Sequence, residues 1–360
     1  MRLTILFFFL FSNFFVFAQN VVPVLDFRGF FRNFNQGFFQ QVEIQRIGEF
    51  KAGDNVVAYV DFRGNLIVYD GKTKKNVANL KVDYQVSDNL MVWKIGGTLN
   101  MWDDGSIRTL SYTNKFYSVK DNIIVFDDVQ SNTLNVYFEG RIIPLFASSV
   151  DLIIPEVIGE NIVAFKDNGN FNKIFWNGEI FDLDVWHSPY HFEAGTDILC
   201  FNDPINGTFT VFENGEFLDV EEFHVGKYKA GRGFIVYENR NGDLMYYSQG
   251  KQKQLTNFGA DENWMVKDDV AVWSENGFTY ALENGVKYEI ARYKPEEIIV
   301  KNDIVAFRDI MGGVSALVNG RVVEITTQMN SEFSIYGSTV LVELFNNSYI
   351  VYSNGRKYTL

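Results

Sequence analysis

Two histidines, a tryptophan and an aspartate lie together in residues 184–192. His187 and His191 are four residues apart, a spacing that places two metal ligands on one face of a helix. Pro189 lies between them and disfavours a helix, so we predict a polar loop without metal, with a loop metal site as the alternative. A tryptophan in such a loop can stack on a sugar, and the candidate ligand contacts are therefore Asp184, Trp186, His187 and His191.

No motif that carries catalysis occurs in the chain. The sequence lacks a Gly-x-Ser-x-Gly elbow, a phosphate-binding glycine loop, a His-Glu-x-x-His helix and an EF-hand loop. Its single cysteine, Cys200, excludes a disulfide scaffold and a cysteine-based zinc site. The 45 acidic residues permit a carboxylate pair for glycoside cleavage, but so many acids always permit some pair. We therefore expect a protein that is not an enzyme and that uses no cofactor.

The N-terminus has the parts of a secretory signal peptide. Arg2 is followed by an apolar stretch, and Val16 and Ala18 occupy the positions where small or β-branched residues precede a cut before residue 19. We expect a signal peptide over 1–18 and one repeat domain over 19–360, with no transmembrane segment left after cleavage. No cysteine follows the cut, so the exported chain is not a lipoprotein and belongs to the periplasm or the cell surface.

An internal repeat fills the rest of the chain. Short apolar runs follow turn residues at Asn55, Asn89, Asn122, Asn161, Asp197, Gly233, Asp269, Asp303 and Thr339. A second run ends each time in a turn glycine, at Gly71, Gly105, Gly140, Gly178, Gly215, Gly250, Gly285, Gly320 and Gly355. From the first to the last of these glycines is 284 residues in eight steps, a period of 35.5 residues. Residues 20–29 match residues 55–64 at an offset of 35 and make a tenth unit.

Each unit is predicted to form four short strands. Asn-Gly between β-rich runs, as at Asn177-Gly178 and Asn284-Gly285, is typical of a tight β-hairpin. The second strand of each unit is apolar at consecutive positions, which indicates burial on both faces. Radial stacking of four-stranded sheets in a β-propeller buries both faces of every unit, whereas a parallel β-helix conflicts with the antiparallel hairpins. Ten copies of the later strands are present but only nine copies of the first, because nothing precedes residue 20 after cleavage.

The pattern of a turn residue, an aromatic-containing apolar run, a glycine hairpin and a short final strand resembles the WD40-like and TolB-type propeller repeats. The stretch over residues 254–273 is similar to the junction where one TolB-type blade leads into the next. The resemblance implies an all-β propeller of about ten units of about 35 residues. These units could form one wide ring, or two five-unit rings divided near 183/184, where the spacing between units is longer.

The N-terminal unit carries more aromatic surface than the next unit. One interpretation is that this surface packs on the last unit and closes the ring. The other is an exposed patch that anchors a partner protein, since Phe and Arg are common at interface centres. Its candidate residues are Phe27, Arg28, Phe30, Phe31, Arg32 and Phe34.

Two function classes follow from these features. The first is an exported, non-catalytic scaffold or accessory subunit that binds an envelope or secreted protein. The second is a propeller that binds or cleaves glycans with the loop 184–192. The net charge of −13 at pH 7 and the pI near 4.8 disfavour nucleic acid as a partner.

Overall fold

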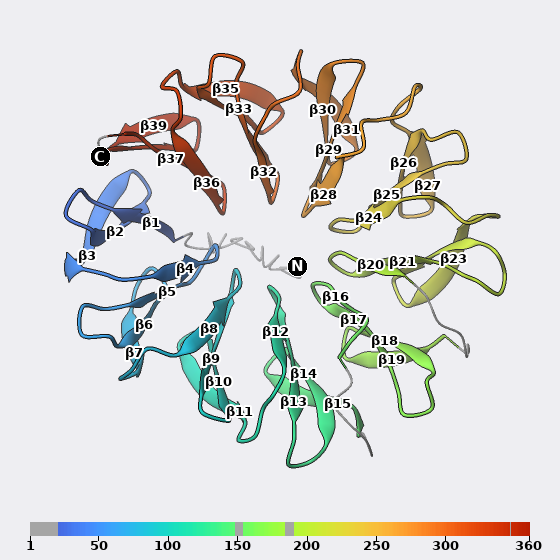
Figure 1. Cartoon of the computed structure of the whole chain (residues 1–360), viewed down its shortest axis with the longest axis horizontal. Coiled ribbons are helices and arrows are strands. Elements are labelled where there is room, and N and C mark those ends of the chain that lie inside the picture. The colour runs from blue at the N-terminus through green and yellow to red at the C-terminus, as the bar shows by residue number, and fades with distance from the viewer. Residues whose placement is uncertain (1–20, 148–153, 184–190, 346) are drawn as a thin grey trace, which may run out of the picture.

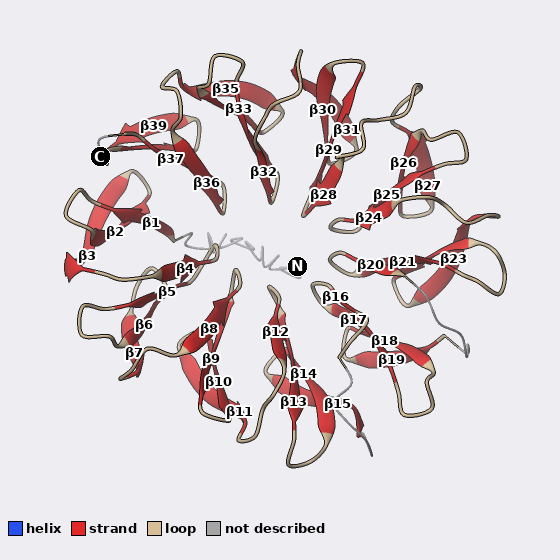
Figure 2. Cartoon of the chain, viewed as in Figure 1, coloured by secondary structure: helices blue, strands red, loops and turns tan. Residues whose placement is uncertain are grey.

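The computed structural model describes residues 21–147, 154–183, 191–345 and 347–360. These residues form ten antiparallel sheets arranged as blades around one axis (Figure 1). In the described residues every regular element is a strand (Figure 2). Nine sheets have four strands, and the first, β1–β2–β3, has three within the described part of the chain. The predicted all-β propeller of ten units is confirmed.

The strands take four positions, counted outward from the axis of the ring. The innermost strands are β4 (Phe50–Ala52), β8 (Asp83–Val86), β12 (Tyr117–Val119), β16 (Val157–Ile158), β20 (Phe192–Ala194), β24 (Tyr228–Ala230), β28 (Met265–Lys267), β32 (Ile298–Lys301) and β36 (Glu332–Tyr336). The second strands are β1 (Val22–Leu25), β5 (Val57–Val60), β9 (Leu90–Ile95), β13 (Ile123–Asp128), β17 (Ile162–Lys166), β21 (Ile198–Asn202), β25 (Ile235–Glu238), β29 (Val270–Glu275), β33 (Ile304–Arg308) and β37 (Thr339–Glu343).

The third strands are β2 (Phe30–Asn35), β6 (Leu66–Tyr69), β10 (Thr98–Asp103), β14 (Thr133–Phe138), β18 (Asn172–Trp176), β22 (Phe209–Glu213), β26 (Leu244–Ser248), β30 (Phe278–Glu283), β34 (Val314–Val318) and β38 (Tyr349–Ser353). The outermost strands are β3 (Phe38–Arg46), β7 (Lys74–Ala78), β11 (Ser106–Ser111), β15 (Arg141–Ala147), β19 (Glu179–Asp182), β23 (Glu216–Glu221), β27 (Lys251–Gln254), β31 (Val286–Ala291), β35 (Arg321–Thr326) and β39 (Arg356–Thr359).

Burial explains why consecutive apolar residues recur in every second strand. All four residues of β5 are buried, because one face of the strand packs on the preceding blade and the other on the following blade. A fully buried aliphatic side chain contributes roughly 1.5–3 kcal/mol of transfer free energy. The apolar cluster between two adjacent blades therefore holds these blades together. The hairpins follow the predicted turn chemistry. Asn177 and Gly178 have φ of 50° and 83°, and Asn284 and Gly285 have φ of 49° and 74°.

The ten blades form one ring, and the alternative of two five-unit rings is wrong. Across the suggested boundary, Leu183 of the fifth blade and Phe192 of the sixth belong to one core cluster. Glu160 N–H donates to the Gly195 carbonyl at 3.0 Å, and Thr196 N–H donates to the Gly231 carbonyl at 3.2 Å, so the bonds continue from blade to blade. The first and last blades lie side by side, with the C-terminus beside the first blade (Figure 1).

Because the strands of each blade are antiparallel, their connections lie alternately on two opposite faces of the ring. The turn face carries the connections from innermost to second strand and from third to outermost strand. The loop face carries the connections from second to third strand and from each outermost strand to the next blade. The predicted signal peptide, residues 1–18, lies outside the described residues. Within the described residues we find no helix with the length and apolarity to cross a membrane.

Candidate functional site

The predicted ligand loop is only partly described by the structure. Asp184, Trp186 and His187 lie outside the described residues. His191 is exposed, and its Nε2 atom lies 3.3 Å from Glu193 Oε1. Its carbonyl accepts a hydrogen bond from the Tyr228 hydroxyl at 2.5 Å. Among the described residues no group of three or more His, Cys, Asp or Glu side chains could hold a metal ion.

Two of the N-terminal candidates are core residues, which removes them from the predicted partner surface. Phe31 is fully buried, and its ring centroid lies 5.2 Å from that of Tyr59 on the second blade. Phe34 is 2% exposed, and its ring centroid lies 5.1 Å from that of Tyr358 on the last blade. Phe34 therefore closes the ring, as one of the two interpretations of this unit expected.

The other N-terminal candidates reach solvent on the loop face. Phe27 is 68% exposed, and the Arg28 guanidinium lies 5.0 Å from its ring centroid. Phe30 and Arg32 are half-buried, and Arg32 forms an ion pair with Asp26 at 3.4 Å. The exposed part of the predicted patch is thus centred on Phe27 and Arg28.

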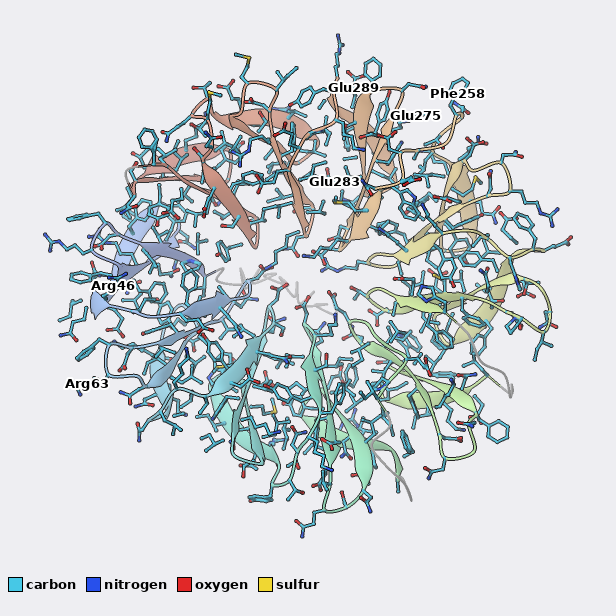
Figure 3. All side chains as sticks on the ribbon, in the orientation of Figure 1. Arg46, Arg63, Phe258, Glu275, Glu283 and Glu289 are labelled. Carbon is cyan, nitrogen blue, oxygen red and sulfur yellow. The ribbon has the colours of Figure 1, made fainter. Side chains whose placement is uncertain are left out.

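The same phenylalanine–arginine tip recurs on the second blade. Asp26 Oδ1 accepts the N–H groups of Arg28 at 2.9 Å and Phe30 at 3.0 Å, which holds the turn closed. At the same place in the next repeat, Asp61 Oδ1 accepts the N–H groups of Arg63 and Asn65, each at 2.8 Å. Phe62 is 55% exposed beside Arg63, which lies at the rim of the ring in Figure 3.

Exposed apolar side chains are divided between the loop face and the outer wall. Phe258, labelled at the rim in Figure 3, is among the most exposed of those on the loop face. In or beside the loop-face connections lie Phe27, Phe62, Leu80, Ile95, Tyr112, Ile154, Phe171, Ile205, Phe258, Phe278, Ile310, Met311, Met329 and Phe345. On the outermost strands lie Phe38, Ile44, Ile107, Ile142, Ile180, Phe217, Leu218, Val286 and Val322. These side chains are spread around the ring, and a site of macromolecular contact requires several of them on adjacent blades.

A polar groove of about 620 Å³ lies on the turn face over the third to sixth blades. Its lining includes the amides Asn89, Asn122, Asn161, Asn177 and Asn214, the carboxylates Asp103, Asp121 and Asp197, and the aromatics Tyr137 and Trp176. Trp176 Nε1 donates to Asp197 Oδ1 at 3.0 Å, and the Tyr137 hydroxyl donates to Asp103 Oδ2 at 2.6 Å. Burial and the bond to Asp103 raise the pKa of Tyr137 to about 12. Amides beside an aromatic ring can bind hydroxyl-rich ligands.

An ion cluster ties the turn face together across the junction of the first and last blades. Lys301 Nζ of the ninth blade lies 2.5 Å from Asp54 Oδ1 and 2.8 Å from Asp88 Oδ1, on the second and third blades. Burial and the neighbouring carboxylates of Asp54 and Asp121 raise the pKa of Asp88 to about 6. Burial and a hydrogen bond with Glu160 likewise raise the pKa of Asp121 to about 6. Because Lys301 contacts Asp54 and Asp88 directly, the cluster links the ninth blade to the second and third blades.

A family model for the 10-bladed β-propeller domain matches residues 15–358. The chain belongs to this family. The predicted identity as a β-propeller repeat protein is therefore confirmed, and ten blades are the family's own number. No curated protein gives a match.

Several solved structures are similar to this chain at low sequence identity. The computationally designed protein Ika8 is 14% identical, with 93% of this chain and 99% of Ika8 covered and a TM-score of 0.39. PorZ, a surface component of the type-IX secretion system of Porphyromonas gingivalis, is 12% identical, with 86% of this chain and 44% of PorZ covered and a TM-score of 0.32. The CRINKLY WD40 ectodomain of the Arabidopsis thaliana receptor kinase ACR4 is 8% identical, with coverages of 76% and 94% and a TM-score of 0.31.

Sequence reasoning did not find the turn-face groove. Its asparagines belong to successive repeats, and each was interpreted by itself as a turn residue. The repeat could have revealed the groove. Asn89, Asn122 and Asn161 hold the same place in consecutive units, and a ring places equivalent residues side by side.

Proposed function

We propose that this propeller is an exported, non-catalytic scaffold that binds an envelope or secreted protein with its loop face. The observation that carries the proposal is the distribution of exposed apolar side chains. They lie in loop-face connections or on the outermost strands, whereas the connections of the turn face consist mainly of polar residues and glycine. Phe27, Phe62 and Phe345 are 68%, 55% and 82% exposed, and they stand on adjacent blades. Aromatic side chains presented in this way serve as anchors at protein interfaces.

Export is part of the same proposal and rests on the sequence of residues 1–18. A partner at the periplasmic or outer surface would meet a strongly acidic protein, which favours partners with a basic contact surface. No cofactor enters this function.

The test is a stoichiometric pull-down with the tagged mature protein from mildly solubilised envelopes. The variant Phe27→Ser/Phe62→Ser/Phe345→Ser should lose the partner and keep the wild-type melting temperature, because all three side chains are already exposed. The matched control is Ile107→Ser/Ile142→Ser on the outermost strands, with 42% and 41% exposure. Retention of the partner by the triple variant, or its equal loss in the control, would show that the loop face is not the binding surface.

Glycan binding is the second candidate, and the turn-face groove favours it. Asn89, Asn122 and Asn214 are exposed along this groove, and Trp176 forms part of its wall. The test is an oligosaccharide array probed with wild-type protein and with Asn89→Ala/Asn122→Ala. Binding that disappears in this variant would assign the groove to a glycan, and an empty array with folded wild-type protein would remove the candidate.

A further inference from the structure

The hairpin tips on the loop face, which join the second strand of each blade to the third, differ in chemistry around the ring. In the third, seventh and eighth blades they contain only Gly, Asn, Asp and Arg. On four consecutive blades of the closed ring, the ninth, tenth, first and second, every tip carries an apolar side chain that is more than half exposed (Figure 1). We call these residues the tip arc: Ile310, Met311, Phe345, Phe27 and Phe62.

Hydrogen bonds and packing fix the tip of the ninth blade in place. Asp309 Oδ1 accepts the N–H groups of Met311 at 2.8 Å and Gly313 at 2.9 Å, the same arrangement that closes the tips of the first and second blades. A Cβ at Gly312 would lie 3.3 Å from Met329 Cγ, so the exposed Met329 side chain packs on this tip and widens its apolar surface. Anchors that are fixed beforehand lose little conformational entropy when they bind.

Three arginines surround the tips of the first and second blades. The guanidinium groups of Arg28 and Arg63 each lie 5.0 Å from the ring centroid of the phenylalanine that precedes them. A Cβ at Gly29 would lie 2.9 Å from Arg46 Cγ, so Arg46 lies against the first of these tips, and Figure 3 labels Arg46 and Arg63 at the rim of the ring. In the part of the chain that the structure describes, no carboxylate forms an ion pair with any of the three. A guanidinium group binds a carboxylate with two parallel hydrogen bonds, so these arginines are complementary to acidic groups of a partner.

The distribution of charge around the ring agrees with this local chemistry. Residues 21–81, which span the first two blades, carry nine Lys or Arg and six Asp or Glu. Residues 191–222 of the sixth blade, on the opposite side of the ring, carry eight Asp or Glu and no Lys or Arg (Figure 1). The acidic excess of the chain therefore lies away from the first two blades, where carboxylates of a partner meet attraction rather than repulsion.

An anionic membrane offers negative charge as well, but it fits the loop face less well than a protein does. A flat bilayer meets the connections of all ten blades. Exposed carboxylates lie in the connections that lead to the seventh and eighth blades, at Glu222 and Glu262, and they repel anionic lipid. A protein of limited contact area can cover the tip arc without reaching them.

We propose that the tip arc binds a surface of the partner protein in which apolar side chains lie beside carboxylates, and that these carboxylates pair with Arg28, Arg46 and Arg63. The apolar tips supply the central anchors, and the charge-assisted pairs at the first two blades fix the orientation of the partner. Basic surface that the overall charge of the chain attracts would face the acidic blades on the other side of the ring. This inference deepens the proposed function and rests on it, because both use the exposed phenylalanines of the tip arc as anchors.

The test selects ligands for the exported protein from a library of random dodecapeptides displayed on phage. The recovered peptides should combine Asp or Glu with Phe, Leu or Met. Fluorescent copies of them, followed by anisotropy, should bind more weakly as the salt concentration rises. Arg28→Gln/Arg46→Gln/Arg63→Gln should weaken binding about tenfold, and Ile310→Ser/Met311→Ser should weaken it by a similar factor.

The matched control is Arg321→Gln/Arg356→Gln/Lys357→Gln. It removes the same charge from exposed positions on the outermost strands of the ninth and tenth blades and should bind the peptides as the wild type does. All of these side chains are exposed, so each variant should keep the wild-type melting temperature.

Each outcome decides the inference. Acidic peptides with apolar residues that bind the wild type and the control, but bind the arginine and tip variants weakly, support it. Peptides without acids, peptides whose affinity is unchanged in the arginine variant, or failure to recover any peptide would overturn it. Sedimentation of the wild type with vesicles of phosphatidylglycerol and phosphatidylcholine, lost in the arginine variant, would also overturn it, because the arc would then bind lipid. If the envelope partner is lost on Phe27→Ser/Phe62→Ser/Phe345→Ser but retained by the arginine variant, the scaffold function stands and this inference alone fails.

Discussion

Replacing Asp121 by asparagine should stabilise the protein at neutral pH. Asp121 shares a partly buried cluster with Asp88 and Glu160, and its Oδ1 atom accepts the Asp88 N–H at 3.0 Å. An amide oxygen at the same place keeps that hydrogen bond and removes one of the negative charges. A pKa raised from 3.8 to about 6 corresponds to about 3 kcal/mol of unfavourable free energy for the ionised group. Because neighbouring acids share this repulsion and Lys301 offsets part of it, we expect a gain of roughly 1–3 kcal/mol.

The sign of the pH dependence follows from the direction of the shift. A carboxyl with a folded-state pKa above its unfolded value binds more protons in the folded protein between these two values. The wild type is therefore penalised above about pH 6, and the penalty fades as the pH falls toward 4. The gain from Asp121→Asn should thus be full at pH 7.5 and small near pH 4. Wild type and variant have the same chain length, so their free energies of unfolding can be compared directly.

Thermal melts of wild type and variant at these two pH values measure the effect. For a chain of this size, a gain of 1–3 kcal/mol raises the melting temperature by roughly 1–4 °C. The control is Asp104→Asn at an exposed turn, where we expect a change within about 0.5 kcal/mol. A variant that is less stable than wild type at pH 7.5, or whose advantage is equal at both pH values, would refute the account of the cluster.

Three further substitutions test the packing of the ring, each by the melting temperature. Lys301→Met leaves the Asp54 and Asp88 carboxylates without their cation and should cost about 3–5 kcal/mol, unless the cluster contributes nothing to closure. Phe34→Ala should cost about 3–5 kcal/mol at the contact between first and last blades, while exposed Phe27→Ala should cost almost nothing; equal effects would contradict the packing. Gly195→Ala places a Cβ 1.9 Å from the Gly231 carbonyl oxygen and should cost at least about 1–3 kcal/mol, and an unchanged melting temperature would mean that the blades are not held that closely.

The fold was predictable because the same local pattern of turns and apolar runs recurs in every repeat. Each Asn-Gly turn sets a hairpin, and each run like that of β5 demands burial on both faces. The number of rings was not predictable from such local signals, because closure depends on how the first and last blades meet. That contact uses side chains from the two ends of the chain, such as Phe34 and Tyr358, which no local pattern brings together.

The site residues were predictable only where the repeat was applied position by position. At the offset of 35, Phe31 and Phe34 correspond to Leu66 and Tyr69, which are core residues of the second blade. The same offset matches Phe27 with Phe62, and both are exposed at a turn tip. Composition alone made the N-terminal unit look like one aromatic patch, whereas the repeat divides it into a core part and a surface part.

The junction of the first and last blades carries a pair of side chains that departs from the repeat. In the fifth and ninth blades an ion pair closes the loop-face end, between Glu156 and Lys166 and between Glu297 and Arg308. In the tenth blade the same two places are Glu332 and Glu343, which stand opposite each other on β36 and β37. A perfectly repeated ring would present the same surface ten times and could not orient a single partner. The junction of the first and last blades departs from the repeat, and the proposed scaffold would need such a departure to hold one partner in a defined position.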